Sequence, residues 1–152
     1  MMAVNFVFLA TAASCMLLTF VYGQQAPIQL DNICLGCICE ASSGCNQTLA
    51  CDGDVCGPFR ITWAFWSDAG KPTLNGEPST NAGAYPRCAN DAFCAGAIIQ
   101  GYMQKFAQDC NGDAVIDCKD FARIHRLGAY GCHGGLDTKY ENAFNSCLRT
   151  YG

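Results

Sequence analysis

The stretch Cys34-Leu-Gly-Cys37-Ile-Cys39-Glu40-Ala-Ser-Ser-Gly-Cys45 decides the fold of this chain. It places four cysteines and one acid within twelve residues. Glu40 is one of three glutamates in the chain and has only small or apolar neighbours. A carboxyl held in apolar, cross-linked surroundings favours its protonated form, as a general acid requires. The segment is therefore a candidate part of an active site as well as a candidate disulfide-linked structural element.

Cysteines outside this stretch indicate an extensive disulfide framework. The chain has thirteen, of which Cys15 lies in an apolar leader. An even number in a short exported chain predicts up to six bridges, and short spacing favours Cys39–Cys45, Cys51–Cys56 and Cys88–Cys94. A zinc site at Cys34 and Cys37 would need a second paired set, which the sequence lacks. The cysteines that remain outside the leader number twelve: Cys34, Cys37, Cys39, Cys45, Cys51, Cys56, Cys88, Cys94, Cys110, Cys118, Cys132 and Cys147.

The leader, residues 1–23, contains no Lys, Arg, Asp or Glu. Its apolar run, Val4 to Val21, is followed by small residues at the positions that a signal peptidase prefers. We expect a secretory signal peptide cut before Gln24, although the run just reaches the length of a membrane anchor. The sequence then predicts one extracellular domain over residues 24–152, without membrane attachment after cleavage.

The net charge of the chain limits the classes of partner that it can bind. The formal net charge is −4, and no run of Lys or Arg occurs. Nucleic acid is therefore excluded as a partner, and long-range attraction to anionic surfaces is not expected. We expect the domain to be a monomer.

Secondary-structure signals predict an α+β domain of several helices and a short β-hairpin sheet. Residues 33–45 read as a compact helical start that ends at Ser43-Gly44. The turn-rich segment 51–58 predicts a hairpin, and 59–66 a strand that runs into a helix. Residues 67–85 read as a long loop.

Three later segments, 90–108, 119–127 and 137–148, read as helices. In the first, Asn90 is the expected N-cap. Its apolar stripe at 3.6-residue spacing consists of Phe93, Ala97, Ile98, Gly101, Tyr102 and Phe106.

Carboxylates near the opening motif suggest glycoside hydrolysis, which needs an acid on one side of the bond and an ionised carboxylate on the other. Glu40 is the candidate acid, and Asp52 and Asp54 are the nearest downstream carboxylates. An Asp-Gly-Asp sequence is equally typical of an ordinary tight turn. The hairpin tip must therefore face Glu40 for either aspartate to serve.

Several ordered blocks give the chain a resemblance to the invertebrate-type lysozymes, also called the destabilase family. It extends from about Cys34 to Cys147 and so covers nearly all of the expected mature chain. After the opening motif, the blocks are Cys56-Gly-Pro-Phe59-Arg-Ile61, Trp66-Ser-Asp68-Ala-Gly-Lys71, Cys88-Ala-Asn-Asp91-Ala-Phe-Cys94, Tyr102-Met103 and Phe121-Ala-Arg123-Ile-His125 through Gly131-Cys132.

The resemblance implies a small lysozyme-like domain with a cleft that cleaves the β-1,4 bond between N-acetylmuramic acid and N-acetylglucosamine in peptidoglycan. It assigns Glu40 as the acid and Asp54, or Asp52, as the second carboxylate. Asp54 precedes Cys56 by only two residues, a shorter turn than the family pattern. The implied substrate-binding residues, for most of which a core role is the alternative, are Phe59, Ile61, Trp66, Tyr102 and His125.

Two other functions stay open at this point. A shortened Asp turn and an acidic chain favour a catalytically degenerate, carbohydrate-binding or immune-effector protein on the same scaffold. Some members of the family are credited with isopeptidase cleavage, which needs an activated nucleophile such as Ser. Ser42, Ser43, Ser67 and His125 are present, but the sequence does not pair them.

The segment from Asp109 to Asp120 has the spacing of a calcium loop. The glycosidase chemistry itself needs no cofactor, so such an ion would be structural. Ala114 stands at the sharp turn where Gly is usual, and a solvated acidic turn is the alternative. The predicted ligands are Asp109, Asn111, Asp113, Val115 (through its carbonyl), Asp117 and Asp120.

A glycosylation sequon, Asn46-Gln47-Thr48, completes the list of candidate sites. Its acceptor, Asn46, lies between Cys45 and Cys51, which restrict access to it.

Overall fold

The computed structural model describes residue 28 and residues 30–152. The expected signal peptide lies outside this part. The α+β class predicted from the sequence is confirmed: helices dominate, beside one two-stranded antiparallel sheet. In chain order the elements are α1 (Asn32–Ser43), β1 (Val55–Cys56), β2 (Ile61–Thr62), α2 (Trp63–Asp68), the 3-10 helix η1 (Leu74–Gly76), α3 (Ala84–Asn90), α4 (Ala92–Phe106), α5 (Cys118–Leu127) and α6 (Thr138–Tyr151).

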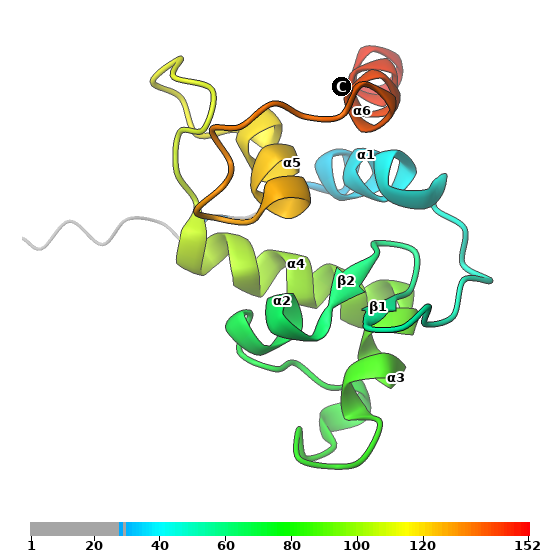
Figure 1. Cartoon of the computed structure of the whole chain (residues 1–152). Coiled ribbons are helices and arrows are strands. Elements are labelled where there is room, and N and C mark those ends of the chain that lie inside the picture. The colour runs from blue at the N-terminus through cyan, green and yellow to red at the C-terminus, as the bar shows by residue number, and fades with distance from the viewer. Residues whose placement is uncertain (1–27, 29) are drawn as a thin grey trace, which may run out of the picture.

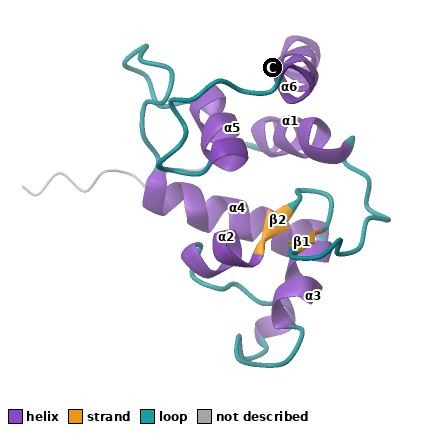
Figure 2. Ribbon diagram, viewed as in Figure 1, coloured by secondary structure: helices purple, strands orange, loops and turns teal. Residues whose placement is uncertain are grey.

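Helix α4 runs through the middle of the domain (Figure 1). Helices α1, α5 and α6 lie on one side of it, and α2, α3 and the sheet lie on the other. Figure 2 shows how small the strand content is: the sheet is a single short hairpin next to α2. Within the described residues, no helix combines the length and apolar character needed to cross a membrane.

Helix α1 begins and ends where the opening motif predicts. The Asp31 carboxylate accepts a hydrogen bond from the Cys34 backbone N–H, which caps the helix. Gly44 adopts a left-handed conformation with φ of 65° and returns its N–H to carbonyls of the last turn. The sequence around Cys34 therefore sets a helix that carries Glu40 close to its C-terminal end.

Two details of the α4 region were predicted wrongly. Helix α3 continues to Asn90, so α4 is capped by Asp91 rather than by Asn90. The apolar stripe is also out of phase at its start, because Phe93 is 92% exposed. Cys94 and Ala95 are both buried, so the buried face of α4 begins one residue after Phe93, with Cys94 held inward by its bridge to Cys88. The expected loop 67–85 also contains the last two residues of α2, the whole of η1 and the first two residues of α3.

Helices α5 and α6 match their predictions closely. An Asp117–Asp120 capping box begins α5, and Gly128 follows its last residue. Asp137 caps α6, which extends to Tyr151, three residues beyond the predicted end. Tyr140 and Phe144 are buried on one face of α6, as their spacing indicates.

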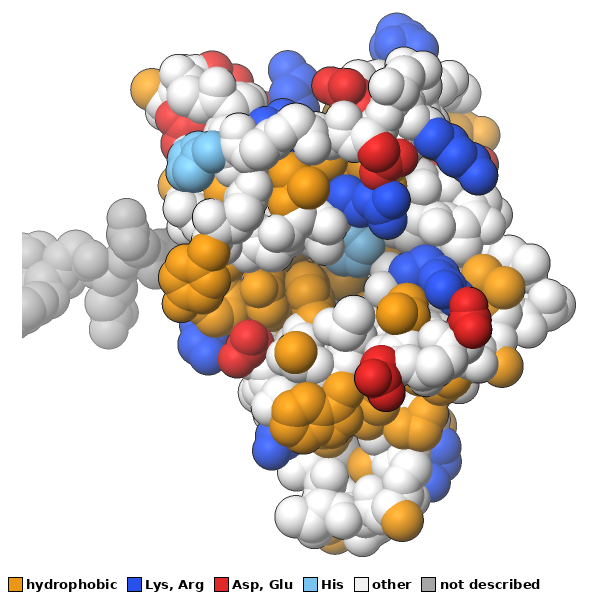
Figure 3. All heavy atoms as spheres, in the orientation of Figure 1, with side chains coloured by type: hydrophobic (Ala, Val, Ile, Leu, Met, Phe, Trp, Pro, Cys, Tyr) orange, Lys and Arg blue, Asp and Glu red, His pale blue; other side chains and the backbone are white. Residues whose placement is uncertain are grey.

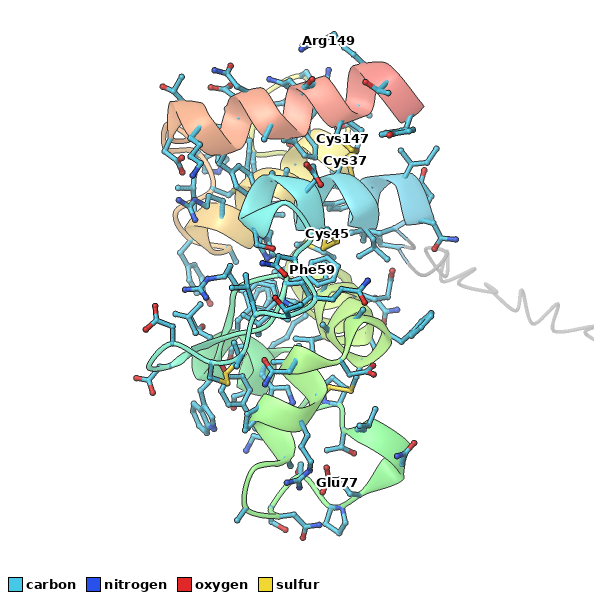
Figure 4. All side chains as sticks on the ribbon, turned by 90° about the vertical axis from the view of Figure 1, so that its right-hand side faces the viewer. Cys37, Cys45, Phe59, Glu77, Cys147 and Arg149 are labelled. Atoms are coloured by element: carbon cyan, nitrogen blue, oxygen red, sulfur yellow. A yellow bond between two sulfur atoms is a disulfide. The ribbon has the colours of Figure 1, made fainter. Side chains whose placement is uncertain are left out.

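Six disulfides hold these elements together, and the three predicted local pairs are confirmed. The other three connect distant segments and typically add about 2–4 kcal/mol each to stability. Two of them fasten α1, one to α5 and one to α6, and Figure 4 shows the bridge between α1 and α6 at Cys37 and Cys147. The bridges are Cys34–Cys118, Cys37–Cys147, Cys39–Cys45, Cys51–Cys56, Cys88–Cys94 and Cys110–Cys132.

Candidate functional site

A depression of about 520 Å³ lies where the β-hairpin and α2 meet the ends of α1 and α5 and the middle of α4. We call it the hairpin cleft. In Figure 3, cationic side chains and a histidine gather in the middle of the face that contains it. Its lining residues are Ser42, Val55, Arg60, Ile61, Thr62, Ala64, Phe65, Asp68, Tyr102, His125, Arg126 and Gly128.

Aromatic rings form one wall of the hairpin cleft. The Phe65 and Tyr102 rings stack with their centroids 3.7 Å apart and their planes 12° from parallel. Burial is the main cause that raises the pKa of the Tyr102 phenol, so this hydroxyl stays protonated at neutral pH. The wall thus offers an apolar face beside neutral polar groups, a common composition for a small-ligand site.

Three of the five predicted substrate-binding residues line this cleft: Ile61, Tyr102 and His125. Phe59 and Trp66 do not line it, and both are buried in the core. The Trp66 indole Nε1–H donates to the Pro72 carbonyl at 2.8 Å, which satisfies its polar atom inside the protein. Phe59 and Trp66 are therefore core residues, which was the alternative to substrate binding.

His125 is fixed by hydrogen bonds on both ring nitrogens. Its Nε2 lies 3.0 Å from the Phe59 carbonyl, and its Nδ1 lies 3.4 Å from the Tyr140 hydroxyl. Because a carbonyl only accepts, Nε2 carries the proton and Nδ1 is the acceptor nitrogen of the neutral ring. The one proton of the Tyr140 hydroxyl is within reach of both the Ala122 carbonyl, at 3.3 Å, and Nδ1. Burial lowers the pKa of His125 from 6.5 to about 4. His125 is therefore neutral at pH 7. Its ring connects α5 to Phe59, in the turn between β1 and β2.

Two arginines bring positive charge to the hairpin cleft. The Arg126 guanidinium donates to Asp137 at 2.7 Å and lies over the Tyr140 ring, 5.3 Å from its centroid. Arg60 has a looser partner, since its nearest contact with the Asp52 carboxylate is 3.7 Å. Arg126 is thus hydrogen-bonded to a protein carboxylate, whereas Arg60 has only a longer ion pair.

Glu40 lies in a different depression, of about 770 Å³, between α1 and α6. We call it the interhelix groove. Its floor includes the Cys37–Cys147 bridge, which Figure 4 shows between the two helices. Its lining residues are Asn32, Ile33, Gly36, Cys37, Glu40, Cys45, Ala143, Ser146, Cys147, Thr150 and Tyr151.

The helical period explains why Glu40 misses the hairpin cleft. Successive residues on an α-helix are rotated by about 100°, so Glu40 and Ser42 point in nearly opposite directions. Ser42 lines the hairpin cleft, whereas Glu40 lines the interhelix groove. Glu40 is also exposed. Its surroundings in the groove are apolar and cross-linked by a disulfide, as expected, but they are open to solvent.

Asp52 and Asp54 lie on the hairpin tip, where both are exposed. The tip forms as predicted, with a bridge between Asp52 and Val55. The Asp54 carbonyl accepts from the Tyr85 hydroxyl at 2.8 Å, which ties the tip to α3. Neither aspartate is among the residues that line the hairpin cleft or the interhelix groove. The structure thus does not bring Glu40 and either aspartate into one depression.

The predicted calcium loop uses its carboxylates to bind backbone N–H groups. The buried Asp120 side chain accepts from the N–H groups of Cys110, Asn111 and Asp117 at 2.8–3.2 Å. The Asp109 carboxylate accepts from Gly112 and Ala114 N–H groups, and the second of these bonds is the main cause that lowers the pKa of Asp109.

Ala114 does adopt the positive φ, 66°, that its loop position demands. Over the described residues, however, no group of three or more His, Cys, Asp or Glu side chains is placed to hold a metal. Asp109 and Asp120 thus bind backbone N–H groups of the loop itself, and a calcium ion held by them together with Asn111, Asp113, Val115 and Asp117 stays a prediction.

Asn46, the sequon acceptor, is exposed. Its side-chain oxygen accepts from both the N–H and the hydroxyl of Thr48, at 3.0 and 2.8 Å. The Asn–Thr pair of the sequon is thus in contact at the surface, and glycosylation of Asn46 stays a prediction.

Sequence reasoning did not predict nine of the lining residues of the hairpin cleft as substrate-binding, among them Arg60, Phe65 and Arg126. Ser42 was considered only as a candidate nucleophile. One signal was available for Arg60, which is the single charge in an otherwise apolar and aromatic segment, 59–66. A charge there must reach the surface between buried neighbours, and such a position marks the edge of a cleft.

Comparison with known proteins adds to this geometry. The destabilase family model matches residues 31–147. Invertebrate-type lysozyme 3 of Caenorhabditis elegans is 36% identical over 118 residues, covering 75% of this chain and 84% of that protein. Lysozyme of Meretrix lusoria is 32% identical, covering 78% and 91%. The crystal structure of Tapes japonica lysozyme superposes with a TM-score of 0.59 at 28% identity, covering 84% of this chain and 96% of that chain.

The family model spans well over half of the chain, and the relatives are matched over most of their own length. The Tapes japonica lysozyme structure shares the overall fold described above. The chain therefore belongs to the destabilase family of invertebrate-type lysozymes.

Proposed function

We propose that this protein is a lysozyme-like glycosidase that acts on bacterial peptidoglycan outside the cell, as a monomer. The observation that carries the proposal is the hairpin cleft, with its aromatic wall and two arginines, in a chain whose relatives are named lysozymes. Six disulfides suit an extracellular protein. Antibacterial defence and digestion of bacteria are the biological uses that such an activity serves.

The catalytic roles in this proposal come from the family resemblance. Glu40 is the assigned acid, and Asp54 or Asp52 is the second carboxylate. Separations of about 5–5.5 Å suit a retaining mechanism, and about 6.5–9.5 Å an inverting one. A glycan that engages Glu40 must reach the interhelix groove as well as the hairpin, so the substrate would cross the C-terminal end of α1.

One observation favours a second candidate, glycan binding without cleavage. Ser42, not Glu40, is the α1 side chain that lines the hairpin cleft. A glycan held only in that cleft would meet hydroxyl, aromatic and guanidinium groups, with Asp68 as the carboxylate in the lining. The shortened Asp turn acts in the same direction.

The isopeptidase alternative has less support. The Ser42 hydroxyl donates to the Ile38 carbonyl at 2.6 Å. His125 uses both ring nitrogens for Phe59 and Tyr140. A Ser hydroxyl bonded to a His ring, the usual sign of an activated nucleophile, is therefore not found among the hydrogen bonds of the described residues.

The deciding experiment measures binding and product release on defined muropeptides with the oxidised mature protein and its Glu40→Gln variant. The proposal expects reducing-end product from the wild type and none from the variant, with both proteins folded. Wild-type binding without product would decide for the second candidate. Equal product from both proteins would retain the glycosidase and remove Glu40 from the acid role.

A further inference from the structure

Arg60 is held at the hairpin cleft by its backbone. It lies in the turn between β1 and β2 with φ of 55°, a left-handed conformation that is uncommon for a residue with a long side chain. Its neighbours Phe59 and Ile61 are both buried, and its own N–H donates to the Gly57 carbonyl at 3.0 Å. These contacts fix the direction in which the side chain leaves the backbone, and Arg60 lines the cleft. Strained residues of this kind cluster at ligand sites.

Protein groups leave the Arg60 charge largely unoccupied. Its ion pair with Asp52 spans 3.7 Å, beyond hydrogen-bond distance, and the Asp52 side chain is 88% exposed. By contrast, the Nε of Arg87 donates to Glu77 at 2.9 Å and the Nε of Arg126 donates to Asp137 at 2.7 Å. In the part of the chain that the structure describes, no hydrogen bond from the Arg60 guanidinium occurs. Its donors therefore stay available to a ligand in the cleft.

The ligand chemistry follows from the guanidinium. A planar fork of N–H donors matches a carboxylate through two parallel hydrogen bonds. The chain as a whole is acidic, with a net charge of −4, so an anionic ligand needs a local cation. Muramic acid carries a lactyl group that is a free carboxylate wherever no stem peptide is attached to it, and neutral chitin has no such group.

We propose that Arg60 binds the lactyl carboxylate of a muramic acid residue without a stem peptide in the hairpin cleft, and so selects peptide-free peptidoglycan strands over neutral amino-sugar polymers. This inference rests on the proposed function, because it places the glycan in that cleft. Phe65 and Tyr102 then receive the sugar face, and this contact does not distinguish the two polymers. Arg60 is a specificity residue here, with no part in bond cleavage.

The test is equilibrium binding of two tetrasaccharides, chitotetraose and the GlcNAc–MurNAc dimer, to the wild type, Arg60→Gln and Arg60→Lys. Arg149→Gln is the matched control, since it removes the same charge from the outer side of α6 (Figure 4). We expect Arg60→Gln to weaken the MurNAc ligand about tenfold, the effect of losing a hydrogen bond to a charged group, and chitotetraose less than about twofold. Arg60→Lys retains the charge without the fork and should give an intermediate loss.

Equal losses for both ligands, or the same loss in Arg149→Gln, would overturn the inference. If neither tetrasaccharide binds the wild type, the proposed function itself fails and the inference fails with it. Circular dichroism of each variant verifies the fold, and Arg60→Lys provides a second reading if Arg60→Gln is unstable.

Discussion

The hairpin cleft and the interhelix groove share one wall, helix α1, but differ in chemistry. The cleft has stacked aromatic rings, two arginines and the cleft-facing Ser42. The groove is mostly apolar, with a disulfide in its floor and Glu40 as its carboxylate. The difference teaches that two residues of sequence are enough to move a functional group from one site to another. The predictions below test which depression contains the chemistry.

The largest expected effect comes from moving the carboxyl across α1. The double variant Glu40→Gln/Ser42→Glu transfers it from the groove to the cleft without changing the net charge. Because a positioned general acid contributes about 10²–10⁴-fold, we expect at least about 100-fold more muropeptide product than from Glu40→Gln alone. Product release is measured by mass spectrometry. No recovery would mean that the cleft is not where the bond is cleaved.

Removing the floor of the groove affects stability instead. We expect Cys37→Ala/Cys147→Ala to lower the free energy of unfolding by about 4–5 kcal/mol, because the bridge closes a long loop of sequence separation 110. Denaturant unfolding measures the loss. Affinity for glycan should stay within about twofold below the transition, since the bridge does not line the cleft. A large loss of affinity in the folded variant would contradict the separation of the two sites.

The next effect is the pH dependence of stability through His125. The pKa of His125 is about 4 in the folded protein and takes its usual value of 6.5 in the unfolded chain. Between pH 6.5 and pH 4, the unfolded chain therefore binds a proton at His125 that the folded protein does not. Stability is therefore full above about pH 6.5 and is lost as the pH falls toward 4, by about 2 kcal/mol between pH 7 and 5.

His125→Gln, which retains a donor for the Phe59 carbonyl, should flatten this slope in denaturant titrations. Asp109 and Asp137 supply an internal reference. Their pKa values are lowered below 3.8, so the stability that they add is lost only at more acidic pH. An unchanged slope between pH 7 and 5 in the variant would show that another group titrates there.

The smallest effect concerns the aromatic wall. Phe65→Ala removes the apolar ring beside Tyr102 on which a sugar ring would pack. At about 25 cal/mol per Å² of apolar surface buried, this packing contributes about 1 kcal/mol, so its loss should weaken affinity about fivefold. Both neutral and acidic tetrasaccharides should weaken alike in isothermal titration. Phe93→Ala, at the exposed ring on α4, is the matched control and should change neither.

The sequence predicted most of the local structure, because the signals for it are local. The predicted ends of α1 at Gly44, of α5 before Gly128 and the start of α6 at Asp137 agree with the structure, and the cysteines five or six residues apart form bridges as expected. These features depend on contacts between near neighbours in the chain. They can therefore be read without knowing how the helices pack.

The functional site was less predictable for the same reason. Helix α1 has cysteines and apolar residues around much of its circumference, so its sequence does not state which side meets the hairpin. The bridges Cys34–Cys118 and Cys37–Cys147 decide that orientation, and both join segments more than eighty residues apart. Glu40 was identified as a notable acid, but the depression it faces depended on those distant pairings.

The cysteine spacing also has a consequence for how the chain oxidises. Cys39–Cys45 closes a separation of 6 residues, whereas the neighbouring Cys37 must find Cys147 across 110. Closing the longer loop costs roughly 2.5 kcal/mol more in chain entropy, so the short pair forms first. Its formation removes Cys39 and Cys45 from competition and leaves Cys34 and Cys37 for the distant helices. The opening motif thus provides an order of assembly, in which the local loop is closed before α5 and α6 are attached.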